Sequence, residues 1–419
     1  MRFLHTSDWH LGRTLEGRSR QAEQEEFIDE ICRLADEEKI DSVLLAGDIF
    51  DSFNPPASAE ELFYDGLDRL SGGGKRAVIV IAGNHDSPER LAASSPLAAR
   101  QGIVLLGLPE DSPPIMPSPD SRQAGVLAGG PSWLELAAPG CEHTAIILAL
   151  PYPSESRLKE LLHGTLDDQA GVQRAYTSKI GRLFAGLAQN YRPDTANLAI
   201  SHIYAQGGLT SDSERPIFSI GGASSVLPED LPPGAQYVAL GHLHRPQSVR
   251  GGGVPCRYSG SPLAYSFSEA GQAKSVVVAD ILPGQPAEQK EIHLSGGCPL
   301  VRWKAGQGLD QVYAWLGEGR DPRAWIDLEV TVGSPLTLQE VHQLRRACSR
   351  FIDIRALYPQ LEPEEAVHSR AGLPIDQLFA LFYQRKYGVS PDVQTVSLFL
   401  DILEGRDEER TEIKGGDRL

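Results

Sequence analysis

At 419 residues, with 41% hydrophobic and 23% charged residues, the chain has the composition of a soluble globular protein and the length of two or three domains. No apolar run reaches transmembrane length, no signal-peptide pattern is present, and the five cysteines are scattered, which argues against a disulfide framework and predicts a reducing cytoplasmic compartment. The net charge of −17 disfavours a protein that coats nucleic acid, although bound divalent ions would add positive charge where a phosphate must sit.

The N-terminal part of the chain alternates strands with helices. Short apolar runs, typical of strands buried on both faces, occupy Phe3–Ser7, Val43–Gly47, Val78–Ala82 and Ile103–Leu106. Apolar residues at helical spacing predict helices over Gln21–Lys39, Glu60–Leu70 and Pro88–Arg100. Ser87 is the expected N-cap of the last of these helices.

The middle of the chain is richer in strands. Residues 108–140 contain much Pro, Gly and Ser, and we predict an extended insertion there. A long helix is expected within Asp167–Asn190. Further strands are expected at Thr144–Leu150, Leu198–Ile203, Tyr237–Leu240, Pro255–Ser259 and Ser275–Ile281. This order predicts an α/β fold, a two-sheet sandwich flanked by helices that spans residues 1–296.

Smaller elements follow. Residues 297–358 are predicted to form a small α/β domain, with strands at Leu300–Lys304, Ile326–Val332 and Ile352–Tyr358 and a helix over Leu338–Arg350 capped near Thr337. Residues 359–374 have the composition of a linker. Two helices with apolar stripes, Ile375–Arg385 and Val393–Leu403, are expected within 375–403, and a charged tail at 404–419 is expected to fray.

Polar side chains able to bind a metal fall in five clusters, each at the end of a predicted strand. They are Asp8, His10, Asp48, Asn84, His202, His242 and His244. Each cluster alone has a commoner explanation, because Gly-Asp and Gly-Asn pairs form turns and a lone strand histidine is usually part of the core. Folding does not require polar residues to recur behind apolar runs, whereas a site for two divalent ions does, so the set favours a hydrolase.

The residue types suit such a site. Asp48 is the candidate bridge, because one carboxylate offers an oxygen to each of two ions. Asp8 and His10 are two residues apart and would share one face of a strand, as would His242 and His244. Imidazoles suit Mn, Fe or Zn better than Mg, and the amide oxygen of Asn84 adds coordination without negative charge.

Three neighbouring residues have other candidate roles. His85 can protonate a leaving alkoxide or stabilise charge on the phosphorane without binding a metal. Asp51 and Asp86 are expected to orient the neighbouring side chains and to fix an imidazole tautomer.

The ordered clusters resemble the motifs of the calcineurin-like metallophosphoesterase superfamily. The resemblance is carried by Thr6–Gly12, Leu45–Asp51, Ile81–Ser87, His202, His242 and His244. Tyr258–Leu263, followed by Phe267 and Glu269, is similar to bacterial DNA nuclease subunits within that superfamily. The resemblance covers the large domain, the small domain and the terminal helices, whereas residues 108–140 match no pattern.

The resemblance implies a two-metal reaction. It assigns Asp8, His10, Asp48 and His244 to one ion, Asp48, Asn84, His202 and His242 to the other, and the role of catalytic acid to His85. Mn²⁺ is the expected metal, with Mg²⁺ as the alternative. The implied activity is ATP-dependent exonuclease action on double-stranded DNA and endonuclease action on single strands and hairpins, in DNA repair, replication and recombination.

The resemblance also implies partners. The chain contains no Gly-x-x-x-x-Gly-Lys-Ser/Thr loop, so ATP would be bound by a separate ATPase subunit. The terminal helices are the candidate dock, unless they fold back onto the small domain. The apolar stripes that would make this contact contain Leu378, Phe379, Phe382, Phe399, Ile402 and Leu403.

DNA contacts and self-association are further expectations. The small domain is implied to be a cap that orients DNA, and Arg13, Arg18, Arg20 and Arg245 are hypothesised to contact phosphates, with ordinary solvated surface as the alternative. A homodimer within a heterotetramer is implied, through the helices at 60–70 and 88–100. Its candidate contacts, which could equally be intramolecular core, are Leu62, Phe63, Leu67, Leu91 and Leu97.

Two other functions remain open. A phosphodiesterase or phosphatase acting on small or phosphoprotein substrates would use the same clusters, and only the long C-terminal extension and Gly260–Pro262 favour the nuclease. A catalytically silent scaffold would be expected to have lost a ligand or His85, and every one of these residues is present.

Overall fold

The computed structural model describes residues 1–116, 122–154, 156–158, 169–214, 218–219, 222–223, 225–358, 374–387 and 390–403. It divides into two compact units, Met1–Leu357 and Tyr358–Leu419. Residues 359–373 of the predicted linker and the predicted tail at 404–419 lie outside the described residues. No helix in the described ranges is both long and apolar enough to cross a membrane.

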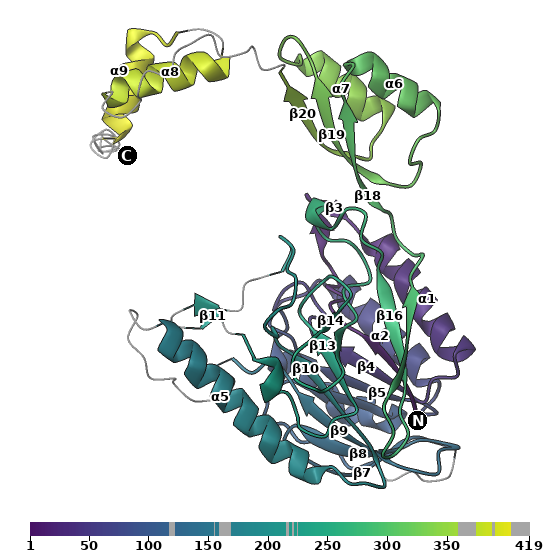
Figure 1. The fold of residues 1–419 in the computed structure, drawn as a ribbon. Coiled ribbons are helices and arrows are strands. Elements are labelled where there is room, and N and C mark those ends of the chain that lie inside the picture. Colours follow the sequence, from purple (N-terminus) through teal and green to yellow (C-terminus); the bar gives the residue numbers. More distant parts are fainter. Residues whose placement is uncertain are drawn as a thin grey trace, which may run out of the picture. The chain divides into compact units, whose positions relative to one another are not determined.

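The first unit is built on two facing sheets (Figure 1). One sheet contains, in spatial order, β17 (Glu288–His293), β16 (Ser275–Asp280), β1 (Arg2–Thr6), β4 (Ser42–Ala46), β5 (Ala77–Ile81) and β6 (Ile103–Leu106). The four strands from β1 to β6 run parallel, while β16 and β17 add antiparallel pairs at one side. Helices α1 (Gln21–Glu37) and α2 (Ala57–Ser71) cover the outer face of this sheet (Figure 1).

The second sheet has the spatial order β14 (Gln247–Val249), β15 (Cys256–Tyr258), β13 (Tyr237–Gly241), β10 (Ala196–His202), β9 (Ala145–Leu150), β8 (Trp133–Ala137) and β7 (Gly125–Gly130). Strands β9, β10, β13 and β15 are parallel neighbours. Helix α5 (Gln169–Leu187) covers its outer face (Figure 1). The predicted α/β sandwich flanked by helices is thus confirmed.

Successive side chains of a strand point to opposite faces of the sheet, and this alternation explains why the core consists of separate layers. Leu44 and Ala46 of β4 pack into the cluster between the two sheets, whereas Val43 and Leu45 face the cluster under α1 and α2. Every residue of β4 and β5 is buried, as expected for central strands that are covered on both faces. A third cluster joins the second sheet to α5 through residues such as Phe184.

Two predictions about local structure are wrong. Residues 108–140 are not an extended insertion throughout, because they contain β7 and β8 at the edge of the second sheet. The helix expected over Pro88–Arg100 is divided into α3 (Pro88–Ala92), α4 (Ser95–Ala98) and a 3₁₀ turn. Pro96 lacks the N–H that a continuous helix needs, and Ser87 stands at the N-cap of α3 without a side-chain hydrogen bond.

The apolar residues proposed for self-association mostly belong to the core of their own chain. Leu62, Phe63, Leu67 and Leu91 are buried in the cluster between α1, α2 and the first sheet. Leu97 is different, because 68% of it is exposed. The apolar stripe of α2 therefore faces inward and belongs to the core of its own chain.

A small parallel sheet follows the sandwich. Its order is β18 (Leu300–Ala305), β19 (Trp325–Thr331) and β20 (Phe351–Leu357), connected through α6 (Leu309–Gly317) and α7 (Leu338–Ala347). The N-terminus of α7 has the expected cap, in which Thr337 and Glu340 bond each other's backbone N–H groups. Two-residue strands complete the unit as β2 (Thr14–Leu15), β3 (Arg18–Ser19), β11 (Phe218–Ser219) and β12 (Gly222–Ala223).

The joint between the sandwich and the small domain is held by a row of glutamates on α1. Glu23, Glu26 and Glu30 accept hydrogen bonds from the backbone N–H groups of residues 295–298. Glu23 also accepts one from the Trp325 indole of the small domain at 2.8 Å. The next residue, Gln24, donates to the His10 carbonyl at 3.1 Å.

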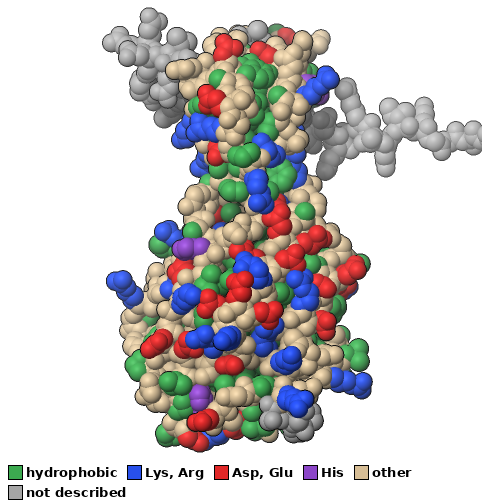
Figure 2. Space-filling model, turned by 90° about the vertical axis from the view of Figure 1, so that its right-hand side faces the viewer, with side chains coloured by type: hydrophobic (Ala, Val, Ile, Leu, Met, Phe, Trp, Pro, Cys, Tyr) green, Lys and Arg blue, Asp and Glu red, His purple; other side chains and the backbone are tan. Residues whose placement is uncertain are grey.

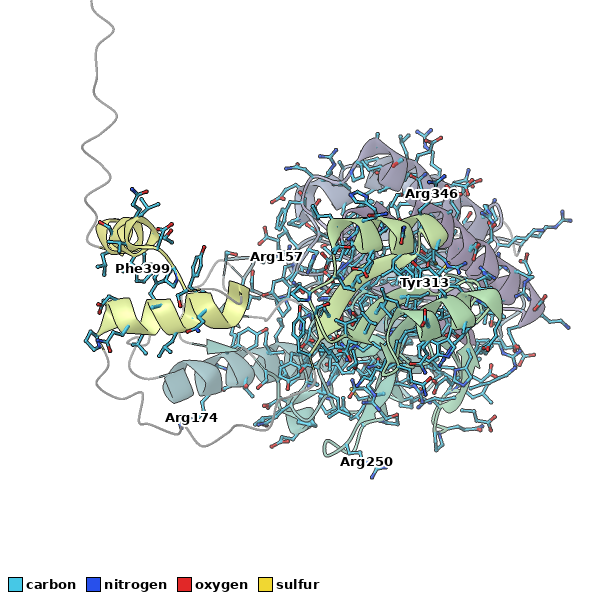
Figure 3. All side chains as sticks on the ribbon, turned by 90° about the horizontal axis from the view of Figure 1, so that it is seen from above. Arg157, Arg174, Arg250, Tyr313, Arg346 and Phe399 are labelled. Atoms are coloured by element: carbon cyan, nitrogen blue, oxygen red, sulfur yellow. The ribbon has the colours of Figure 1, made fainter. Side chains whose placement is uncertain are left out.

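The second unit contains α8 (Ile375–Tyr387) and α9 (Val393–Leu403). Phe379 stacks on Phe399, which Figure 3 labels, in a nearly face-to-face arrangement: the ring centroids are 3.9 Å apart and the planes are 7° from parallel. This stack joins two of the side chains predicted to bind a partner. The side chains of Ile402 and Leu403 lie outside the described residues.

Candidate metal centre

The candidate ligands gather where strands of both sheets end. Asp8 and His10 follow β1, Asp48 follows β4, and Asn84 follows β5 in the first sheet. His202 ends β10, and His242 and His244 follow β13 in the second sheet. Because β1, β4 and β5 are parallel neighbours, as are β10 and β13, their carboxyl ends meet at one edge of the sandwich.

The ligand backbones adopt conformations that are uncommon outside glycine. Asp8, His10 and Asp48 have φ values of 54°, 44° and 50°, and His242 has 111°. Such backbones persist only where the surrounding structure enforces them, and they concentrate at functional sites.

Neighbouring glycines let the motif loops pack closely. A Cβ on Gly83 would lie 2.1 Å from Oδ1 of Asp48, and one on Gly241 would lie 1.8 Å from the Ala46 carbonyl oxygen. Gly47 has a φ of 83°, in agreement with the expected sharp turn. Each of these positions excludes even a methyl group.

The side chains form groups that could hold a metal ion, and two of these groups meet at Asp48. In one group Asp8, His10 and His244 offer donor atoms within 4.8 Å of one another, and in the other Asp48, His202 and His242 do the same. The Asp48 Oδ2 lies 3.4 Å from His202 Nε2 and 3.7 Å from His10 Nε2, so this carboxylate stands between the groups. The Asn84 Oδ1 lies 3.0 Å from His202 Nε2 and 3.2 Å from His242 Nδ1. Carboxylate, amide and imidazole donors together suit divalent transition metals.

Burial and mutual charge shift the titration of these groups. Burial raises the pKa of Asp8. Burial also acts to raise the pKa of Asp48, but the imidazoles of His202 and His85 outweigh it and hold that pKa well below its usual range. Burial lowers the pKa of His202, yet the Asp48 carboxylate outweighs burial and raises it to about 9. The buried carboxylate charge is therefore balanced by a cation, a role that a bound metal ion would take over.

Hydrogen bonds on Nδ1 orient two imidazoles. His202 Nδ1 lies 2.9 Å from the Ala46 carbonyl, and His85 Nδ1 lies 2.8 Å from the Asp51 carbonyl. A carbonyl can only accept, so each Nδ1 carries the proton and each Nε2 is turned toward the site. His10 Nδ1 faces the Asp51 carboxylate at the longer distance of 3.5 Å.

His85 lies beside the two groups. Its side chain is 3% exposed, its Nε2 is 3.9 Å from Asp48 Oδ2, and its backbone N–H donates to Asp48 Oδ1 at 2.9 Å. Its ring also meets that of His10 edge-on, with centroids 4.7 Å apart. Since His10, Asp51 and His85 also lie within 4.8 Å of one another, His85 could alternatively bind a metal.

Asp51 contributes its backbone carbonyl oxygen to the site, and Asp86 contributes its side-chain carboxylate. Asp86 accepts the N–H groups of Ile49, Phe50 and Gly83 at 3.1, 2.9 and 2.8 Å, which ties the loop after β4 to the loop after β5. Burial raises the pKa of Asp86 to about 6. The imidazole tautomer that is expected to be fixed is that of His85, whose Nδ1–H donates to the Asp51 carbonyl oxygen.

Two further residues contact the candidate site although no motif in the sequence points to them. Arg157, which Figure 3 labels, donates to the carbonyl oxygens of Gly83 and Asp86, each at 2.8 Å. Tyr265 packs edge-on against His10 and His244, with centroids 5.3 and 5.6 Å apart. Both residues contact partners that are distant in the sequence, and the spacing of residues along the chain does not predict such contacts.

The four arginines proposed as phosphate contacts differ in their surroundings. Arg20 does not fit the prediction, because it is 2% exposed and its guanidinium pairs with Glu23 and donates to the Ala264 carbonyl. Arg18 donates to the Phe351 carbonyl of the small domain. Arg13 pairs with Asp51 at 3.3 Å, whereas Arg245 is exposed.

The surface on the α1 side of the molecule carries charges of both signs. Acidic and basic side chains are interspersed across the face that Figure 2 shows. This face therefore does not form an extended basic surface.

Comparison with known proteins places this arrangement in context. The family model described as calcineurin-like phosphoesterase matches residues 1–246. The SbcD subunit of the nuclease SbcCD from Bacillus subtilis (strain 168) is 46% identical over 410 residues, covering 98% of this chain and 99% of that protein. The corresponding SbcCD protein from Rhodobacter capsulatus is 35% identical over 309 residues, covering 73% of this chain and 72% of that protein.

A solved structure is also similar. A dimetal phosphatase from Danio rerio is 13% identical and matches with a TM-score of 0.37, covering 70% of this chain and 95% of that chain. The sequence similarity to the Bacillus protein extends further, beyond the sandwich into the small domain and the terminal helices.

Proposed function

The chain belongs to the calcineurin-like phosphoesterase family, and from this premise we propose that it is a DNA nuclease subunit that hydrolyses phosphodiesters with two bound divalent ions. The observation that carries the proposal is the convergence of two metal-binding groups on Asp48. Similarity over 98% of the chain to the SbcD subunit of a nuclease SbcCD supports DNA as the substrate. Roles in DNA repair, replication and recombination follow from this proposal.

The chain's own residues would hold the ions in two overlapping sets. Asp8, His10, Asp48 and His244 would bind one ion, and Asp48, Asn84, His202 and His242 the other. Bound Mn²⁺, or alternatively Mg²⁺, would supply a Lewis acid and lower the pKa of a water molecule. The histidine-rich donor set favours Mn²⁺ over Mg²⁺.

His85 would serve as the proton donor to the leaving oxygen. Its Nδ1–H is committed to the Asp51 carbonyl, so a protonated His85 offers its second N–H from Nε2, which is turned toward Asp48. Transfer of that proton to the leaving alkoxide would return His85 to the neutral tautomer that its backbone partner already selects.

Replacing His85 by Gln is expected to lower cleavage of hairpin-ended DNA by roughly 10²-fold while leaving Mn²⁺ affinity nearly unchanged. Gln preserves a polar side chain but cannot deliver a proton at neutral pH. The measurement compares both proteins on hairpin DNA and on a small chromogenic phosphodiester, with Mn²⁺, in the presence and absence of SbcC and ATP.

The matched control is His342→Gln, which changes an exposed histidine on α7 and should leave every rate unchanged. Turnover of the small ester alone, with DNA intact under all conditions, would move the chain to the small-substrate phosphodiesterases or phosphatases. Absence of all turnover in the unmodified protein would favour a silent scaffold.

We further propose that an SbcC ATPase subunit supplies ATP binding and docks on α8 and α9. Phe379 and Phe399 already pack on each other, but Leu381, Phe382 and Leu398 remain 50%, 58% and 55% exposed. Exposed apolar side chains on a separate helix pair suit burial by a partner.

Deleting residues 371–419 is expected to abolish co-purification with SbcC and to spare Mn²⁺-dependent hydrolysis of the small phosphodiester. The deleted residues belong to the second compact unit, whereas all the candidate ligands lie in the first. A sharper pair of variants is Phe382→Ser against Tyr313→Ser, since Tyr313 is 39% exposed on α6 of the small domain. Undiminished SbcC binding by the deleted chain would sink the docking proposal.

DNA contact and self-association also stay proposals. Arg13 and Arg245 remain candidates for phosphate contact, and Arg18 would instead help to hold the small domain that caps the site. Homodimerisation within a heterotetramer would use the surface of α2 to α4 that includes Leu97 and Tyr64, which are 68% and 41% exposed.

A further inference from the structure

His244 is held differently from the other imidazoles of the centre. Its Nδ1 lies 2.6 Å from the hydroxyl oxygen of Ser213, whereas His202 and His85 use backbone carbonyls. Ser213 belongs to the loop after β10, outside every motif cluster, yet it is only 6% exposed. A buried hydroxyl directed at a metal-binding imidazole needs a physical explanation.

A buried ion pair lies behind Ser213. The Ser213 hydroxyl is 2.5 Å from Glu269 Oε1, and Glu269 Oε2 pairs with the ammonium group of Lys274. The side chains of Glu269 and Lys274 are 0% and 8% exposed. Lys274 also donates to the His244 carbonyl at 2.9 Å and to Ser261 Oγ at 3.1 Å, so its donors are used. An ion pair buried this deeply is retained only where its hydrogen bonds are satisfied.

The direction of these hydrogen bonds fixes the tautomer of His244. A carboxylate paired with Lys274 only accepts, so the single Ser213 proton is donated to Glu269. The Ser213 oxygen then accepts from His244, which places the imidazole proton on Nδ1. The lone pair remains on Nε2, which lies 3.1 Å from His10 Nε2. Ser211 Oγ, 2.8 Å from Ser213 Oγ, has its own acceptor in Glu214 and does not compete for this proton.

The loop that carries Ser213 is fastened independently of the hydroxyl. Glu214 accepts the His244 backbone N–H at 2.8 Å, and Arg13 donates to the Ser213 carbonyl at 3.3 Å. The Asp212 N–H donates to Ser268 Oγ at 3.1 Å. Removing only the Ser213 hydroxyl would therefore leave the loop attached and remove the hydrogen-bonded connection between Glu269 and His244, so that only the longer direct approach of His244 Nδ1 to Glu269 Oε1 at 3.6 Å remains.

We propose that Ser213 is a positioning residue that, with Glu269 and Lys274, fixes His244 with its lone pair on Nε2 and so sets the ion affinity of the Asp8–His10–His244 group. The proposal rests on the two-metal function in assigning His244 as a ligand, but it does not depend on the substrate. It adds a contribution to metal binding from a loop outside the family's motif clusters.

The test is Mn²⁺ binding to the full chain, measured by isothermal titration and by the electron paramagnetic resonance of free Mn²⁺. Ser213→Ala is expected to weaken one of two binding events by about 10- to 100-fold and to leave the other unchanged. Ser213→Thr keeps the hydroxyl and should restore most of the affinity. Nitrogen-15 spectra of the metal-free histidines should show an Nδ1-protonated His244 in the unmodified chain and a tautomer mixture in Ser213→Ala.

Ser268→Ala is the matched control, because it removes a hydroxyl that fastens the same loop without touching His244. Equal weakening by Ser268→Ala and Ser213→Ala would reduce Ser213 to a loop anchor and overturn the proposal, as would unchanged affinity in Ser213→Ala. Binding of fewer than two ions by the unmodified chain would overturn it together with the two-metal site. Two-ion binding with the predicted variant pattern but no DNA cleavage would sustain it while the nuclease proposal fails.

Discussion

Asp48→Asn is expected to lower Mn²⁺-dependent turnover of DNA and of a small phosphodiester by roughly 10³-fold or more. The Asp48 carboxylate lies between the two metal-binding groups, and its Oδ1 also accepts the His85 backbone N–H. An amide keeps the size of the side chain and tolerates its left-handed backbone, but it removes the negative charge and one of the two ligand oxygens. Both ions would lose the negative charge of a carboxylate that they would share.

The measurement combines steady-state turnover with Mn²⁺ titration of the same samples. Weakening of both binding events is expected, in contrast to the single event affected in Ser213→Ala. Asp212→Asn makes the same chemical change at a loop residue outside the metal-binding groups and should leave turnover unchanged. Turnover of Asp48→Asn within about tenfold of the unmodified chain, some 1.4 kcal/mol of barrier, would contradict a bridging role for this carboxylate.

Gly83→Ala is expected to reduce turnover as strongly as Asp48→Asn does, although it adds only one methyl group. The new Cβ would lie 2.1 Å from Asp48 Oδ1 and 2.2 Å from the Asp48 backbone nitrogen, so the backbone itself has to move. Asp86 and Arg157 hold Gly83 from the other side, through its N–H and its carbonyl oxygen. We expect a loss of turnover on the order of 10³-fold and a loss of about 1–3 kcal/mol in the free energy of unfolding.

The control for this prediction is Gly186→Ala in α5, where the added Cβ would meet no atom of the described residues within 4 Å beyond its chain neighbours and the backbone of its own helix. That variant should be neutral, or stabilising by up to about 1 kcal/mol, because Ala has the higher helix propensity. Turnover and denaturant unfolding are measured on both variants. Unimpaired hydrolysis in Gly83→Ala would show that the loops after β4 and β5 can separate without loss of the site.

The positions of the candidate ligands could be predicted because each cluster directly follows an apolar run that predicts a strand. Apolar runs such as Val43–Ala46 define parallel strands, and parallel strands bring their carboxyl ends to one edge. This rule accounts for Asp8, Asp48 and Asn84, which follow neighbouring strands of the first sheet, whereas the approach of His202 from the second sheet is implied only by the resemblance to the family. The roles assigned to individual ligands remain predictions.

Features that depend on tertiary contact could not be predicted in this way. Strand β7 contains Gly125, Gly129 and Gly130, so its composition indicates a loop, and only pairing with β8 makes it a strand. Arg20 follows the first motif as Arg13 does, but its burial beside Glu23 has no local signature. The connection from Glu269 to His244 likewise joins residues from separate segments of the chain.

The first turn of α1 has a mechanical consequence. Its Glu23 holds the Trp325 indole of the small domain at 2.8 Å, while the adjacent Gln24 holds the His10 carbonyl at 3.1 Å and receives the Gly12 N–H at 3.2 Å. A force that tilts the small domain would act on Glu23 and, through the adjacent Gln24, on the backbone that carries His10. The first turn of α1 therefore links the small domain to the candidate ligand His10 through two adjacent side chains.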